Sequence, residues 1–150
     1  MTVTTPESRV EPPPVVHAAA LLWLCAVAAG AFEATLVVAR DLSAFGELLP
    51  GLAFRVAVFA TAIFLALRLR QGQNWARLTL AVGLGVFGTL SLVVEPVRWL
   101  LAGHSVGEAL AAADTVGLVF GASRILHLMA VLGAMVLMFQ PRANAYFRSA

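Results

Sequence analysis

The chain has 150 residues, of which 61% are hydrophobic and only 12% are charged. Soluble domains have about 45–50% apolar and about 25% charged residues, so this composition excludes an ordinary soluble fold and indicates an integral membrane protein. The formal net charge of +2 comes without a basic patch, and we therefore predict no nucleic-acid partner.

The first fourteen residues are polar and rich in proline. The three consecutive prolines, Pro12 to Pro14, keep this stretch extended up to the start of the first helix. The apolar run that begins at Val15 is too long for a signal peptide. Residues 1–14 are therefore predicted to be a disordered cytoplasmic tail that leads into a retained membrane span.

Four long apolar segments follow, and they predict an all-α integral membrane four-helix bundle over residues 15–141. A helix needs about 20 apolar residues to cross the hydrocarbon core. The spans are expected at residues 15–39, 51–67, 76–101 and 116–139, with a cytoplasmic tail at 142–150. In the loop before the last span, Ser105 and Glu108 have the spacing of a capping box, which predicts a short surface helix or an outward extension of that span.

The distribution of arginine predicts the orientation. Six of the ten arginines fall on one side of the predicted spans, namely Arg9, Arg68, Arg70, Arg77, Arg142 and Arg148. Cytoplasmic loops carry an excess of positive charge, so both termini are predicted to lie in the cytoplasm, with the protein in the cell membrane. Four aromatic residues at the span ends are expected to form an interfacial belt: Trp75, Trp99, Tyr146 and Phe147.

Two short motifs lie on the predicted cytoplasmic side. The loop between spans two and three reads R-x-G-x-N-W-A-R, with Arg70, Gly72, Asn74, Trp75 and Arg77, and the C-terminus reads P-x-x-N-x-Y-F from Pro141. These motifs resemble those of small, mostly uncharacterised four-span membrane proteins of GC-rich bacteria. The resemblance implies a fold and a membrane location, and it implies no activity.

Physical chemistry gives the loop motif a structural interpretation. Gly72 suits a turn or helix C-cap, Asn74 suits the N-cap of span three, and Trp75 suits the headgroup region. The arginines are expected to face anionic lipid. A docking site for a cytoplasmic partner is the functional alternative.

The two halves of the chain also resemble each other. Gly30-x-Phe32 and the apolar residues after it are repeated by Gly85-x-Phe87 about 55 residues later. Two parallel hairpin repeats would explain this similarity, although apolar segments also align by chance, and both explanations remain open. Small residues at Ala26/Gly30, Ala81/Gly85 and Gly117/Gly121 have the spacing that lets helices approach closely.

Ionisable residues inside spans are functional candidates because each is costly unless it is paired or hydrated. All of those found here fall toward the outer side of the membrane: Glu33, Arg55, Glu95, Arg98, Arg124 and His127. Glu95 and Arg98 are three residues apart and can pair, and Arg124 and His127 share a helix face in the same way. The cluster is either an interhelical network that holds the bundle together or an outward polar vestibule for an anionic headgroup or small solute. Glu33 is the first choice for a functional residue.

The three histidines, His17, His104 and His127, are too dispersed for a metal or haem site, and we predict no cofactor. The small size and the lack of a catalytic motif favour a non-enzymatic accessory or assembly subunit of a membrane complex. The alternative function is a small transporter or channel protomer. The expected partners are the lipid bilayer and either other membrane subunits or a second copy of the chain.

Overall fold

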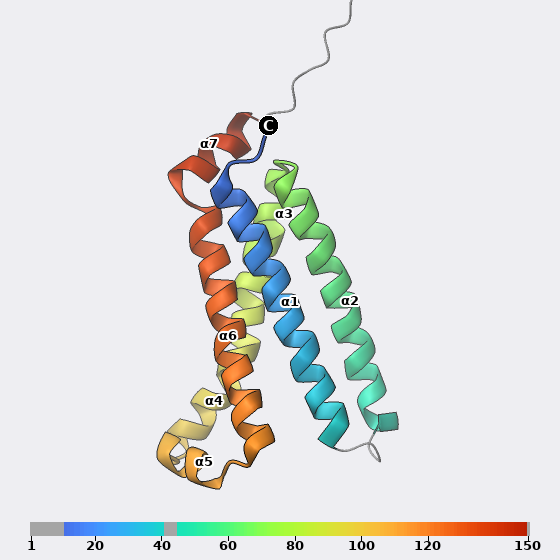
Figure 1. Cartoon of the computed structure of the whole chain (residues 1–150), viewed down its shortest axis with the longest axis vertical. Coiled ribbons are helices and arrows are strands. Elements are labelled where there is room, and N and C mark those ends of the chain that lie inside the picture. Colours follow the sequence, from blue (N-terminus) through green and yellow to red (C-terminus); the bar gives the residue numbers. More distant parts are fainter. Residues whose placement is uncertain (1–10, 41–44, 150) are drawn as a thin grey trace, which may run out of the picture.

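The computed structural model of the protein describes residues 11–40 and 45–149, so most of the predicted N-terminal tail lies outside the described residues. The described residues form an all-α bundle, which confirms the predicted fold class (Figure 1). Four helical segments are long and apolar enough to cross a membrane: Pro14–Arg40, Gly46–Arg70, Asn74–Leu101 and Thr115–Met138. The elements in chain order are α1 (Pro14–Arg40), α2 (Phe45–Arg70), α3 (Asn74–Thr79), the π-helical segment η1 (Leu80–Gly88), α4 (Thr89–Leu101), α5 (Val106–Ala112), α6 (Thr115–Met138) and α7 (Pro141–Ser149).

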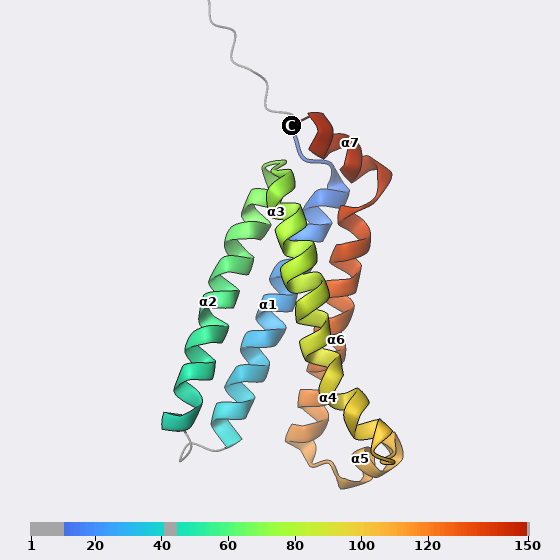
Figure 2. The same ribbon diagram turned by 180° about the vertical axis from the view of Figure 1, so that it is seen from behind.

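The bundle has two distinct ends, which are seen in Figures 1 and 2. The start of α1, the turn from α2 to α3 and the helix α7 lie together at one end, which we call the α7 end. The helix α5 and the start of α6 lie at the opposite end, which we call the α5 end. In α5, Ser105 and Glu108 form the predicted capping box, with hydrogen bonds of 3.2 and 2.9 Å between side chain and backbone.

The second span is longer than predicted at both ends. α2 begins at Phe45 and contains Pro50, whereas the predicted span begins only after this proline. Proline removes one backbone hydrogen bond, which is tolerable near a helix end where water can reach the freed carbonyl. α2 also continues beyond the predicted limit at Leu67, and it stops at the turn around Gly72, which has a positive φ of 78°. There the amides of Gly72 and Gln73 bond to carbonyls of the last helical turn in a Schellman motif.

The third span is a continuous helical rod of three segments, and its middle segment was not predicted. η1 is rich in glycine and forms π-helical turns, which are wider than α-helical turns and recur at functional sites. A β-carbon at Gly85 would collide with the end of the Met135 side chain, so Met135 as placed packs directly against this glycine where η1 meets α6. Beyond η1, no residue of α4 or α5 is fully buried within the described structure.

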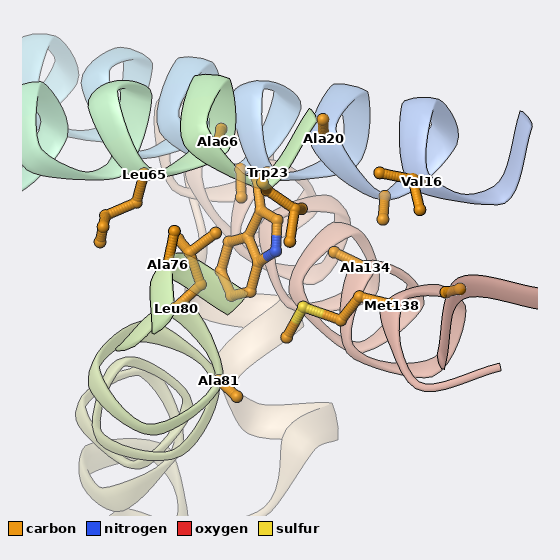
Figure 3. Packing of buried hydrophobic residues seen from close by; sticks show 14 of the residues in the cluster. Val16, Ala20, Trp23, Leu65, Ala66, Ala76, Leu80, Ala81, Ala134 and Met138 are labelled. Carbon is orange, nitrogen blue, oxygen red and sulfur yellow. The ribbon is translucent and has the colours of Figure 1, made fainter. Parts of the chain in front are cut away.

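The core lies in the half of the bundle toward the α7 end, and Trp23 is at its centre (Figure 3). Trp23 is only 1% exposed, and its indole lies among Leu80 of η1 and Ala134 and Met138 of α6. Several of the residues that pack in this core are alanines, and their small side chains let the helix backbones come close to one another.

The four spans do not pack equally. α1 contacts α6 and α2 extensively, whereas α2 meets the third span mainly through α3 and η1 and makes at most slight contact with α4. Gly30 of α1 allows α2 and α6 to approach α1 closely. A β-carbon at this position would lie 3.0 Å from the ring of Phe59 on α2 and 3.2 Å from the ring of His127 on α6. Because α2 makes so little contact with α4, spans two and three separate toward the α5 end (Figure 2).

Replacing Trp23 by alanine should destabilise the bundle in detergent micelles by about 2–3 kcal/mol. Large-to-small core changes cost about 3–5 kcal/mol for tryptophan in soluble proteins, and the part due to transfer from water is absent in an apolar solvent. The free energy of unfolding, measured by circular dichroism in a denaturing-detergent titration, checks this value. Leu21→Ala, on the exposed face of the same helix, is the control and should change it by less than about 0.5 kcal/mol. Equal losses for the two variants would contradict the packing described here.

Candidate functional site

A cavity of about 410 Å³ lies inside the bundle, among α1, α2, the third span and α6. Its floor is at Trp23, and its walls are mostly apolar side chains such as Val58, Phe59 and Leu92. Glu33, Arg55, Arg124 and His127 also line it, so four of the six predicted intramembrane polar residues meet at one site. The volume is within the range of small-molecule binding sites in proteins, about 300–1,000 Å³.

The cavity opens sideways, between α2 and α4. Its exposed lining residues belong to these two helices: Gly51, Phe54 and Arg55 on α2, and Ser91 on α4. The lining residues on α1 and α6 are buried or half-buried. In a membrane this opening faces the acyl chains of the leaflet at the α5 end, because the bundle has no other helix there to cover it among the described residues.

The polar centre of the cavity is the carboxylate of Glu33, whose side chain is 6% exposed. Oε1 of Glu33 lies 3.2 Å from Nδ1 of His127, and Oε2 lies 4.0 Å from Nη1 of Arg124. Glu33 is about two helical turns from the end of α1 at Arg40, hence about 10 Å inside the span at about 1.5 Å per residue. At this depth a carboxylate needs partners from its own protein, and α6 supplies both of them.

Arg124 also joins α6 to α4. Its Nη2 donates a hydrogen bond of 3.2 Å to the carbonyl of Leu92. Pro96 is four residues after Leu92 and has no backbone N–H, so this carbonyl has no donor in the regular α-helical pattern. The arginine thus satisfies a carbonyl that a proline leaves free inside the membrane. The Nε of Arg124 has no partner among the described residues.

Two predicted site residues remain outside this network. Glu95 and Arg98 are exposed on α4, and no ion pair joins them in the described structure, so the prediction that they take part in one buried network is wrong. Glu95 and Arg98 are six and three residues from the end of the span at Leu101, hence within about 10 Å of it, so their side chains can reach toward the membrane surface without pairing to each other. Sequence reasoning also missed an ion pair at the α5 end, where Nη2 of Arg40 lies 2.5 Å from Oδ1 of Asp114, the N-cap of α6. The signal for it was an arginine that ends one helix and an aspartate that precedes another.

At the α7 end, the two motifs of the resemblance come into contact. The hydroxyl of Tyr146 donates a 3.0 Å hydrogen bond to the carbonyl of Arg70, and Arg77 donates a hydrogen bond to the side-chain oxygen of Asn144. These hydrogen bonds therefore join the region of the loop between α2 and α3 to the helix α7. One motif supplies Arg70 and Arg77, and the other supplies the α7 residues Asn144 and Tyr146.

Several predictions at this end are corrected. Tyr146 and Phe147 are buried in the core instead of forming an aromatic belt, and Arg77 is largely covered by α7, with only 7% of it exposed. Helix α7 explains both changes, because it folds back over the end of the bundle (Figure 1). It thereby brings its own residues Tyr146 and Phe147 into the core and places Asn144 against Arg77. Asn74 is the first residue of α3 and not its N-cap, which is Gln73.

The remaining motif residues are at the surface. Trp75 is exposed, as expected of an interfacial anchor, and its indole N–H donates to the Gln73 side chain at 2.9 Å. Arg70 is exposed too. Across the described residues, no three His, Cys, Asp or Glu side chains lie close enough together to hold a metal ion.

The four spans define the chain as a multi-pass α-helical membrane protein, and the cavity gives it a polar site within the apolar bundle. In comparisons with protein-family models, curated proteins and solved structures, no significant match to the chain is found. The resemblance to small four-span bacterial proteins therefore stays a prediction.

Glu33 and Arg124 should be energetically coupled. Glu33→Gln leaves Arg124 without a carboxylate, and Arg124→Gln leaves Glu33 with His127 as its one remaining partner among the described residues. The double variant should therefore lose less stability than the sum of the two single losses. We expect a coupling energy of about 0.5–3 kcal/mol from the four unfolding free energies.

The matched control combines Glu33→Gln with Arg98→Gln, which removes the same charge from an exposed position of α4. Those two changes should be additive to within about 0.5 kcal/mol. A coupling energy near zero for Glu33 and Arg124 would show that the observed geometry is not stabilising.

Proposed function

We propose that the protein is a non-enzymatic membrane protein that binds an amphiphilic anion in the cavity between α2 and α4. The single observation that carries this proposal is the combination of a laterally open apolar cavity with a polar network at its α5-end half. An apolar chain fits the walls formed by Val58, Phe59 and Leu92, and a headgroup fits the region near Arg55 and Arg124.

The charges of the cavity favour a negative headgroup. Arg55 and Arg124 contribute two positive charges, and the Glu33 carboxylate neutralises one of them. Arg55 has no ion-pair partner among the described residues, so its charge is available to a ligand. An arginine pairs well with carboxylate or phosphate oxygens, which supports an acidic lipid or a similar molecule as the ligand.

For the orientation, we propose that the α7 end is cytoplasmic and that the cell membrane is the location. Arginines at this end are abundant, and the acids among the described residues are mostly at the other end. The cavity would then open toward the outer leaflet. This arrangement agrees with the outward vestibule of a small transporter or channel protomer, and it makes ligand binding the first step of either role.

Filling the mouth of the cavity should abolish binding. Gly51 lines the cavity and has open space where a β-carbon would be, so Gly51→Phe places a ring at the mouth without a clash at its first carbon. Gly46 also has open space, lies on the same helix and does not line the cavity, so Gly46→Phe is the matched control. Binding of dansyl-undecanoate to the protein in nanodiscs, measured by dansyl fluorescence against empty nanodiscs, should be weakened at least tenfold only by Gly51→Phe.

A second variant tests the charge of the ligand. Arg55→Gln should weaken binding of dansyl-undecanoate by about tenfold, the value of one charged contact, and should leave binding of its uncharged methyl ester unchanged. Equal effects on the acid and the ester would argue against recognition of an anionic headgroup, and no effect of either Gly51→Phe or Arg55→Gln would exclude the cavity as the binding site.

The second candidate function is an accessory or assembly subunit of a larger membrane complex. The observation that favours it is the segment formed by α4 and α5, which has no fully buried residue and carries the exposed charges Glu95 and Arg98 inside or near the membrane. Another membrane protein could cover this segment and pair these charges. Native mass spectrometry after gentle detergent extraction distinguishes this accessory role from the transporter role that ligand binding would serve. A stable complex with unrelated subunits supports the accessory role, whereas a symmetric homo-oligomer with flux in liposomes supports transport.

A further inference from the structure

A second pocket, of about 370 Å³, lies at the α7 end, on the far side of the bundle from the cavity around Glu33. It is formed where the third span begins and α7 folds back over it. Six residues line this pocket: Asn74, Arg77, Pro141, Asn144, Phe147 and Arg148. Two of them are arginines, two are asparagines, and none is acidic.

Arg77 is the central residue of the pocket, and only 7% of it is exposed. Its guanidinium carbon lies 4.3 Å from the centre of the Phe139 ring and 4.9 Å from the centre of the Phe147 ring. The guanidinium thus makes cation–π contacts with two aromatic rings, and its N–H donors need partners of their own. One of these donors bonds to Asn144, and the Nε–H has no partner among the described residues.

The charge of Arg77 is also not balanced. No carboxylate of the described residues lies within ion-pair distance of it. A buried charge is normally paired, and a buried donor is normally bonded, because water no longer solvates them. The exposed Arg148 of α7 adds a second positive charge to the same pocket. Both features indicate that the pocket holds an anion.

Asn144 makes this arrangement specific. Its side-chain oxygen accepts from Arg77, and its side-chain nitrogen donates to the carbonyl of Phe139 at 3.0 Å. The amide is therefore held from both sides, and it fixes the plane of the guanidinium relative to the pocket. A planar guanidinium held in this way matches the oxygens of a phosphate group better than a flexible ammonium would.

We propose that the Arg77 pocket binds a phosphate group, supplied by an anionic phospholipid of the adjoining leaflet. The position of the pocket supports a lipid as the source. Spans three and four start and end beside it, at Asn74 and Met138, so it lies at the depth where lipid headgroups meet the bundle. Trp75, which is next to Asn74, is exposed at the same level, as residues of the membrane interface commonly are.

The test uses the full chain in detergent micelles, with arginine side chains labelled with ¹⁵N. The Nε–H resonance of Arg77 reports on this pocket alone and not on the cavity around Glu33, and it is assigned by its loss in Arg77→Lys. Titration with dihexanoyl phosphatidylglycerol should shift this resonance in a saturable manner. Titration with dihexanoyl phosphatidylcholine should produce at least tenfold weaker binding, since its headgroup has no net charge.

Arg148→Gln is the second variant, because an exposed residue can be changed without risk to the fold. It should weaken binding of phosphatidylglycerol by about five- to tenfold, the usual effect of one arginine beside an anionic lipid. Arg142→Gln is the matched control, since Arg142 is exposed on the same helix and does not line the pocket. It should weaken binding by less than twofold.

Inorganic phosphate distinguishes the two sources of the anion. If phosphatidylglycerol saturates the site at concentrations far below those required for phosphate, the lipid is the ligand and the proposal holds. Saturation by inorganic phosphate without any response to the lipid would overturn the lipid as source. An Arg77 resonance that neither compound shifts, or equal effects of Arg148→Gln and Arg142→Gln, would overturn the pocket itself.

Discussion

The fold depends on one buried carboxylate. Glu33 is about 10 Å inside its span and cannot remain charged in lipid without partners from the protein. His127 and Arg124 of α6 provide them, at 3.2 and 4.0 Å, and this contact holds α1 and α6 in one relative position. Gly30, one turn earlier, allows this close approach, because a β-carbon there would lie only 3.2 Å from the His127 ring and 3.0 Å from the Phe59 ring. Packing and electrostatics therefore require the same pair of helices to be close.

This close contact has a consequence on the opposite side of the bundle. Where α1 and α6 pack closely, α2 and α4 make at most slight contact, and the cavity opens between them. The π-helical η1 and Pro96 both interrupt the regular third span near this space, and Arg124 compensates for the carbonyl that Pro96 leaves free. The polar network thus stabilises the bundle and lines its cavity with the same side chains, so a structural role of Glu33 does not exclude a role in binding.

Much of the fold could be predicted from the sequence, because hydrophobic length and the lack of unpaired charge define membrane spans with little ambiguity. The grouping of Glu33, Arg124 and His127 could be predicted as well, since polar residues at the same depth are expected to find one another. The burial of Arg77 could not be predicted from the sequence. Its burial depends on α7, a short helix that the sequence pattern did not distinguish from a polar tail, and on contacts between segments about 67 residues apart. The separation of α2 from α4 likewise depends on π-helical geometry, which has no reliable sequence signal.

The most direct test is a measurement of the central contact in a lipid bilayer. Solid-state NMR dipolar recoupling between ¹³Cδ of Glu33 and ¹⁵Nδ1 of His127 gives their separation without changing either residue. The structure places Oε1 of Glu33 3.2 Å from Nδ1 of His127, so the labelled pair should lie about 4 Å apart. A separation beyond about 6 Å would show that the two side chains are not hydrogen-bonded, and it would contradict the proposed basis of the fold and of its cavity.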